Sequence, residues 1–207
     1  MESLLKNDFT SHYNLAASTV SNICATTTTA TFELNDDNVL IHTVVNAGVA
    51  KYSNPTSAEV TVLNFEAFIN SLPNAFKIGK EKCDLLVYTN TDFLLNELTD
   101  TLPKYVTPYL NTKGPQQGKR QKAITQLYSS LQLIMEVSTI RVFINRRSIR
   151  RCCFFNKQAI APAGITASVA FNKLNTIASQ GLKMNNPAIA DLGFELWEFS
   201  GNQVCTI

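Results

Sequence analysis

Apolar side chains recur at the spacing of a helix in several parts of the chain. After Asn64, a residue type that often caps helix N-termini, apolar residues stand at i, i+3, i+4 and i+7 until Pro73 ends the pattern. The same spacing recurs from Ile124 to Met135 and can continue toward Arg141. Spacing and Pro or Gly boundaries predict further helices over residues 92–102, 162–181 and 187–197.

A different pattern occupies the middle of the N-terminal half. Residues 29–34 partly alternate between polar and apolar side chains, are rich in β-branched residues and lead into the turn-forming run Asn-Asp-Asp-Asn at 35–38. Residues 39–45 are again mostly apolar or β-branched, so this stretch predicts a β-hairpin. Residues 85–88 fit either a short buried strand or the approach to the helix over 92–102.

These elements predict a mainly α fold with a small β-hairpin and extended N- and C-terminal arms. A chain of 207 residues that is 45% hydrophobic can bury one sizeable core. Residues 1–24 have only a weak helical pattern, so we expect an N-terminal arm that orders against a neighbouring molecule. Residues 25–200 are then the core domain and residues 201–207 a C-terminal tail.

Composition favours a soluble protein that is not secreted. No basic segment followed by a long apolar run opens the sequence, and no stretch approaches eighteen consecutive apolar residues. Five cysteines form an odd set without Cys-x-x-Cys spacing, which suits a reducing cytosol.

Charge is distributed very unevenly along the chain. Residues 113–157 contain ten Lys or Arg and a single acid, a net charge of +9, whereas the rest of the chain has eight basic and fifteen acidic residues. A positive segment of this density typically faces phosphates, an anionic membrane or an acidic partner. No long amphipathic helix with a clean basic face supports the membrane alternative.

The sequence offers no convincing catalytic or metal site. His12 and His42 are the only histidines, and neither accompanies a nucleophile motif. The run GPQQGKR at residues 114–120 differs from a phosphate-binding loop, because three residues rather than four separate its glycines and Arg120 replaces the Ser or Thr that would bind Mg²⁺. We therefore expect no enzymatic activity, no cofactor and no metal.

The run RVFINRRSIRRCCFFNK at residues 141–157 carries the main functional hypothesis. If residues 140–155 were helical, Arg146, Arg147, Arg150 and Arg151 would share one side and apolar residues the other. Arginine suits a phosphate-binding wall because its planar fork binds phosphate bidentately and keeps its charge when partly buried. The predicted RNA-binding residues are these four arginines, Asp191, Lys119, Arg120 and Lys122. The plainer alternative is a solvated basic surface.

Two short motifs resemble the coat proteins of flexuous filamentous plant viruses, namely the alphaflexivirus, betaflexivirus, potyvirus and closterovirus groups. The first is Ile-Arg-Arg-Cys-Cys-Phe-Phe at residues 149–155, and the second, about forty residues later, joins Gln-Gly-Leu-Lys at 180–183 to Ala-Ile-Ala-Asp-Leu-Gly-Phe-Glu at 188–195. The resemblance implies that Arg150 and Asp191 form a salt bridge beside an RNA groove. It also implies that arms join the subunits into a helical filament.

The sequence therefore predicts a viral capsid protein, located in the virion and the host cytoplasm, whose partners are single-stranded RNA and further copies of itself, with no membrane. One alternative is the nucleocapsid protein of a segmented negative-strand RNA virus. Another is a non-viral RNA-binding protein or silencing suppressor. An enzyme of unknown type is the alternative from a different class.

Overall fold

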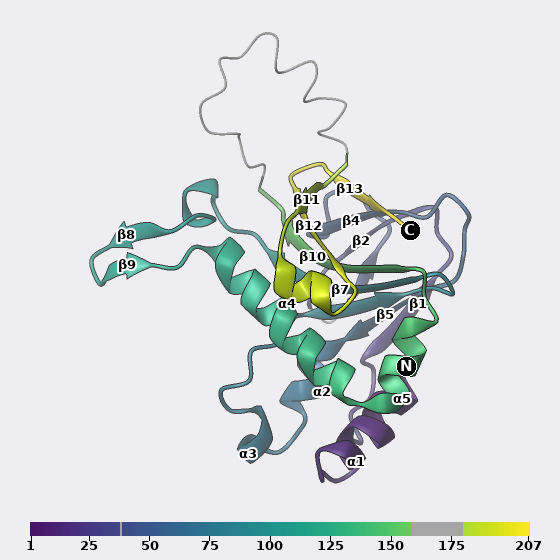
Figure 1. Cartoon of the computed structure of the whole chain (residues 1–207). Coiled ribbons are helices and arrows are strands. Elements are labelled where there is room, and N and C mark those ends of the chain that lie inside the picture. The colour runs from purple at the N-terminus through teal and green to yellow at the C-terminus, as the bar shows by residue number, and fades with distance from the viewer. Residues whose placement is uncertain (38, 159–179) are drawn as a thin grey trace.

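The computed structural model describes residues 1–37, 39–158 and 180–207 (Figure 1). Of these residues, 30% are helical and 31% are in strands, which form three sheets. The prediction of a mainly α fold with a small hairpin is therefore wrong, and the protein has an α/β fold built on a mixed sheet. Most of the predicted helix over 162–181 lies outside the described residues.

The central sheet has seven strands. Across the sheet these are β1 (Cys24–Thr27), β5 (Val60–Asn64), β6 (Leu85–Tyr88), β7 (Asp92–Thr99), β10 (Ile149–Asn156), β12 (Glu195–Ser200) and β11 (Leu182–Met184). The strands from β1 to β7 pair antiparallel, β10 lies parallel to both β7 and β12, and β11 is antiparallel to β12. The β7 to β10 connection is a crossover through two helices, as parallel neighbours require.

Each face of this sheet is covered by a different layer. The helices α4 (Lys119–Glu136) and α5 (Ser138–Asn145) pack on one face, where they meet Cys152 and Phe154 of β10. A four-stranded sheet packs on the other face against Cys153 and Phe155, in the order β13 (Val204–Thr206), β4 (Ala50–Ser53), β2 (Thr31–Leu34) and β3 (Ile41–His42). Strand β10 is thus buried on both sides.

The remaining elements are short. They are the N-terminal π-helix η1 (Leu4–Phe9) with α1 (Thr10–His12), the helices α2 (Phe65–Asn70), α3 (Asn74–Lys77), η2 (Pro103–Tyr105) and α7 (Pro187–Asp191), and the two-stranded hairpin of β8 (Tyr109–Asn111) and β9 (Gly114–Gln116). This hairpin extends away from the body of the molecule (Figure 1).

Several predicted elements are confirmed. Helix α2 begins at Asn64, whose side chain accepts a hydrogen bond from the Ala67 amide, and α4 covers the periodic segment from Ile124 to Met135. Strands β2 and β3 form the predicted hairpin, and residues 85–88 are the buried strand β6. Helix α4 does not continue toward Arg141 without a break, because a bend of 109° separates it from α5.

Two predicted helices are strands, and both errors have the same cause. Residues 92–99 form β7 and residues 149–156 form β10. Strands in a parallel arrangement that are covered on both faces read as nearly continuous apolar runs, so they lose the alternation that would distinguish them from a helix. The predicted helix over 187–197 is also only partly correct, since α7 ends at Asp191 and β12 follows.

The terminal segments pack against their own chain. Leu5 and Phe9 are fully buried in the core with residues of α4 and α5, and the Tyr13 hydroxyl donates its hydrogen bond to Glu136 at 2.7 Å and lies 3.0 Å from the Leu133 carbonyl. Residues 204–206 form β13, which pairs with β4. The structure thus places part of the proposed arm and tail within the fold, and contacts with a neighbouring molecule stay a prediction.

Candidate functional site

The arginines of the 141–157 run do not form one wall. Successive residues of a strand point to opposite faces of the sheet, and Arg150 and Arg151 are both in β10. Arg150 donates to the Asn145 side chain at 2.8 Å and lies beside Gly193, on the helix side. Arg151 lies on the other side, where it donates to the Thr206 carbonyl at 3.1 Å. The predicted helical arrangement of these residues is therefore wrong.

The other two arginines differ in their surroundings. Arg147 stacks over the Phe143 ring at 3.6 Å and donates to the carbonyls of Phe143 and Thr89, so it closes the end of α5. Arg146 is exposed to solvent. Arg147 and Arg151 are thus engaged in holding the fold together.

The ion pair implied between Arg150 and Asp191 is not formed. Asp191 is an exposed residue at the end of α7, and among the described residues no salt bridge joins it to Arg150. The turn after α7 nevertheless approaches Arg150, since a Cβ at Gly193 would lie 3.4 Å from the guanidinium. Arg151, not Arg150, has a nearby carboxylate, that of Glu195 at 3.9 Å.

Of the three basic residues predicted near 119–122, Arg120 has an internal role. Its Nε and Nη2 each donate to a carboxylate oxygen of Glu198 at 2.8 Å, and only 5% of the Glu198 side chain is exposed. This bidentate pair fastens the first turn of α4 to strand β12. Lys119 and Lys122 are exposed on the same turn of the helix.

Glu198 belongs to a row of side chains that crosses three parallel strands. Phe154 of β10 is in register with Glu97 of β7 and with Glu198 of β12, so all three side chains face α4. Glu97 is 9% exposed, and its Oε2 has no hydrogen-bond partner among the described residues. Two acids in one row thus have different environments, one paired with arginine and one not.

Burial, together with the nearby acids Asp84 and Glu66, raises the pKa of Glu97 to about 9, although Lys122 acts in the opposite direction. Burial likewise raises the pKa of Asp84 to about 7, although the Leu98 amide donates to its carboxylate at 2.7 Å. Glu97 is therefore a neutral carboxylic acid at pH 7.

These raised pKa values predict how stability depends on pH. The folded protein holds protons on Asp84 and Glu97 that the unfolded chain releases. The contribution of these two groups to the free energy of unfolding is therefore complete only at acidic pH, and it is lost as pH rises toward 7 for Asp84 and toward 9 for Glu97. Between pH 7 and 9, Glu97 alone should cost about 1 to 3 kcal/mol. We expect Glu97→Gln to remove this decline in urea unfolding, and a wild-type stability that is level from pH 7 to 9 would contradict the assignment.

A small cavity adjoins Glu97 at the carboxyl end of β7. Its volume is about 70 Å³, and it is lined by Glu97, Leu98, Thr99, Lys119, Lys122, Ala123, Gln126 and Phe154. The carboxyl ends of parallel strands, next to the start of the following helix, are the usual ligand-binding edge of an α/β sheet.

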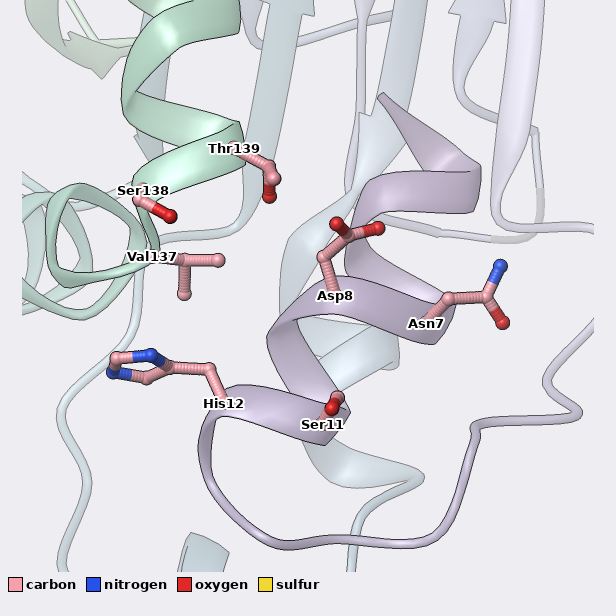
Figure 2. A pocket seen from close by; sticks show the side chains of 7 residues that line it. All are labelled: Asn7, Asp8, Ser11, His12, Val137, Ser138 and Thr139. Atoms are coloured by element: carbon pink, nitrogen blue, oxygen red, sulfur yellow. The ribbon is translucent and has the colours of Figure 1, made fainter.

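A larger hollow of about 420 Å³ lies between the N-terminal helix and the start of α5. Figure 2 shows Asp8 and His12 on one side and Ser138 and Thr139 on the other. Across the described ranges, no three His, Cys, Asp or Glu side chains come close enough to hold a metal ion. The hollow thus offers few groups that would converge on a ligand.

The most distinctive surface feature is the segment from Lys104 to Lys122, which we call the basic arm and which includes the projecting β8–β9 hairpin and the first turn of α4 (Figure 1). It contains five Lys or Arg, and no Asp or Glu occurs anywhere between residues 101 and 135. Its strands pair from Tyr109 with Gln116 to Asn111 with Gly114. Lys104, Lys113 and Lys119 are exposed, and Leu110 is 79% exposed.

Two tyrosines at the base of the basic arm form a compact aromatic group. The rings of Tyr105 and Tyr109 are 4.8 Å apart and inclined at 61°, and the Lys104 ammonium lies 4.8 Å from the Tyr105 ring. Gly118 closes this base against the chain, since a Cβ there would lie 2.3 Å from the carbonyl carbon of Thr107. The arm therefore combines positive charge with partly exposed aromatic surface.

The predictions from the sequence did not include this arm. The available signals were the absence of acids over 101–135 and the two tyrosines four residues apart, beside the turn-forming Asn-Thr-Lys-Gly. A role for Glu97 was not predicted, because nothing in the neighbouring sequence distinguishes a buried acid from an exposed one.

Within the described residues, no single helix is long and apolar enough to cross a membrane, and α4 and α5 meet that criterion only as a pair bent by 109°. Comparison with protein-family models, curated proteins and solved structures found no significant match.

Proposed function

We propose that the protein binds single-stranded nucleic acid along the basic arm, with little preference for sequence. The observation that carries this proposal is the set of four exposed lysines on the basic arm, which form no salt bridge within the described residues and accompany the paired rings of Tyr105 and Tyr109. Lysines attract the phosphate backbone, and aromatic rings stack with unpaired bases of any identity.

The charge distribution supports the arm rather than the arginine run as the binding surface. Arg120, Arg147 and Arg151 have partners inside the protein. Lys104, Lys113 and Lys119 are instead exposed and form no salt bridge within the described part of the chain. Phosphates that approach the arm therefore meet uncompensated positive charge.

Binding of a labelled oligouridylate, measured by fluorescence anisotropy over a series of KCl concentrations, tests the proposal. The logarithm of the association constant should fall linearly with the logarithm of salt concentration, by about 0.7 for each phosphate neutralised. Duplex RNA of the same length should bind more weakly, because its bases are not available for stacking. An affinity that does not change with salt would contradict the proposal.

The resemblance to flexuous-virus coat proteins implies a second activity besides the binding of single-stranded nucleic acid. This activity is helical polymerisation around genomic RNA. Leu110 supports a role for the arm in self-association, since it is 79% exposed near the tip of the hairpin. Negative-stain electron microscopy of the protein mixed with RNA should then show flexuous filaments. Closed rings would favour the nucleocapsid alternative, and dispersed monomers would contradict polymerisation.

A further inference from the structure

The cavity between β7 and α4 has a chemical character that nucleic-acid binding along the arm does not explain. It lies at the carboxyl ends of the parallel strands β7 and β10, where Leu98, Thr99 and Phe154 form its wall. A volume of about 70 Å³ exceeds the roughly 30 Å³ that a water molecule occupies in the liquid. The space therefore suits two waters or one small polyatomic group.

Glu97 supplies the unusual feature of this cavity. Although the residue is 91% buried, its Oε2 has no hydrogen-bond partner within the described part of the chain. Buried polar atoms are nearly always paired, so an unpaired carboxyl oxygen on a residue that lines a cavity indicates a missing partner. The carboxyl is neutral at pH 7, since burial and the acids Asp84 and Glu66 disfavour its ionised form, and it can donate a hydrogen bond.

The opposite wall of the cavity is positive. Lys119 and Lys122 contribute to the lining from the first turns of α4, an 18-residue helix whose N-cap, Gly118, offers no side-chain acceptor to the first amides. The partial positive charge of a helix N-terminus adds to that of the two ammonium groups. The charged groups around the cavity thus favour an anion, which accepts hydrogen bonds, over a metal cation.

We propose that this cavity binds a small oxyanion, either phosphate or the terminal phosphate of a nucleotide chain. One oxygen of the anion accepts a hydrogen bond from the Glu97 carboxyl, and others accept from the ammonium groups of Lys119 and Lys122. No covalent step is involved. The site shares Lys119 and Lys122 with the basic arm, and free phosphate tests it separately from nucleic-acid binding.

Isothermal titration of the full-length protein with inorganic phosphate at pH 7 tests the site. We expect saturable binding that weakens at least tenfold in Lys119→Met/Lys122→Met and is unchanged in the matched Lys77→Met/Lys80→Met control, whose lysines lie near α3. Equal affinity in the first variant and the wild type would overturn the proposal, as would a failure of phosphate to bind the wild type.

The role of Glu97 is tested by measuring how anion binding depends on pH. Sulfate is the probe, because its charge is constant between pH 7 and 9. Binding to the wild type should weaken as pH rises from 7 toward 9, whereas Glu97→Gln, which keeps a hydrogen-bond donor, should bind at both pH values. If the affinity for sulfate changed with pH in the same way in the wild type and in Glu97→Gln, Glu97 would not be part of the site. Circular dichroism of each variant checks that the fold is intact.

The two sources of the anion are distinguished with oligonucleotides that do or do not carry a 5′-phosphate. A terminal phosphate as the source predicts tighter binding of the phosphorylated strand by wild type, and loss of that difference in Lys119→Met/Lys122→Met. Free phosphate as the source predicts equal binding of both strands. In that case phosphate should still saturate the site when the arm binds no nucleic acid.

Discussion

Replacement of Arg120 by Met should destabilise the protein by about 3 kcal/mol, a larger effect than any surface substitution. The substitution leaves the Glu198 carboxylate, which is 5% exposed, without the two hydrogen bonds that compensate its burial. Loss of one partner from a buried ion pair typically costs about 3 to 5 kcal/mol. The lower value applies because the Arg120 side chain is 29% exposed. Urea unfolding monitored by circular dichroism measures the change.

A second variant distinguishes two causes of the lost stability, namely the unpaired charge of Glu198 and the loss of side-chain packing. Arg120→Met/Glu198→Leu removes both charges beside Phe154, and an apolar pair of similar size is often as stable as a buried ion pair. The double variant should recover most of the lost stability. If Arg120→Met had the stability of the wild type, the pair would not hold α4 to β12.

Neutralisation of two lysines of the basic arm should weaken the binding of single-stranded RNA by roughly 10- to 100-fold at low salt. Lys104→Gln/Lys113→Gln removes two phosphate contacts, each worth about 1 kcal/mol or somewhat more. The slope of the logarithm of affinity against the logarithm of salt should fall in magnitude by about 1.4. Fluorescence anisotropy provides both quantities, and both lysines are exposed, so folding should be unaffected.

Lys77→Gln/Lys80→Gln is the matched control for this experiment. It makes the same change in net charge near α3, away from the arm (Figure 1). If nucleic acid binds the arm, the control should retain the wild-type affinity and salt dependence. Equal losses in both double variants would mean that net charge alone, and no particular surface, governs binding.

The elements that could be predicted from the sequence are those with one polar and one buried face. Helix α4 buries Leu127 and Leu131 while Gln132 of the same helix is exposed, so its period is visible. Strand β10 has no such contrast, because Cys152 and Phe154 face the helices and Cys153 and Phe155 face the second sheet. Four consecutive apolar residues fit a helix as well as a strand.

The error at β10 also explains the error in the candidate site. In a helix, Arg147, Arg150 and Arg151 would share a side, whereas in a strand Arg150 and Arg151 separate to opposite faces. The pairing of Arg120 with Glu198 could not be predicted locally, since 78 residues separate the two along the chain. The high basic content of residues 113–157 was visible, but which of its charges have internal partners depends on tertiary structure.

Ultraviolet cross-linking of the protein to oligouridylate, followed by mass spectrometry of the linked peptides, tests the central claim most directly. Stacking of bases on the basic arm predicts cross-links at Tyr105 and Tyr109, which disappear in competition with unlabelled RNA and decrease in Lys104→Gln/Lys113→Gln. Cross-links confined to the surface around Arg141 and Arg146, or none above the background of a protein that does not bind RNA, would contradict it.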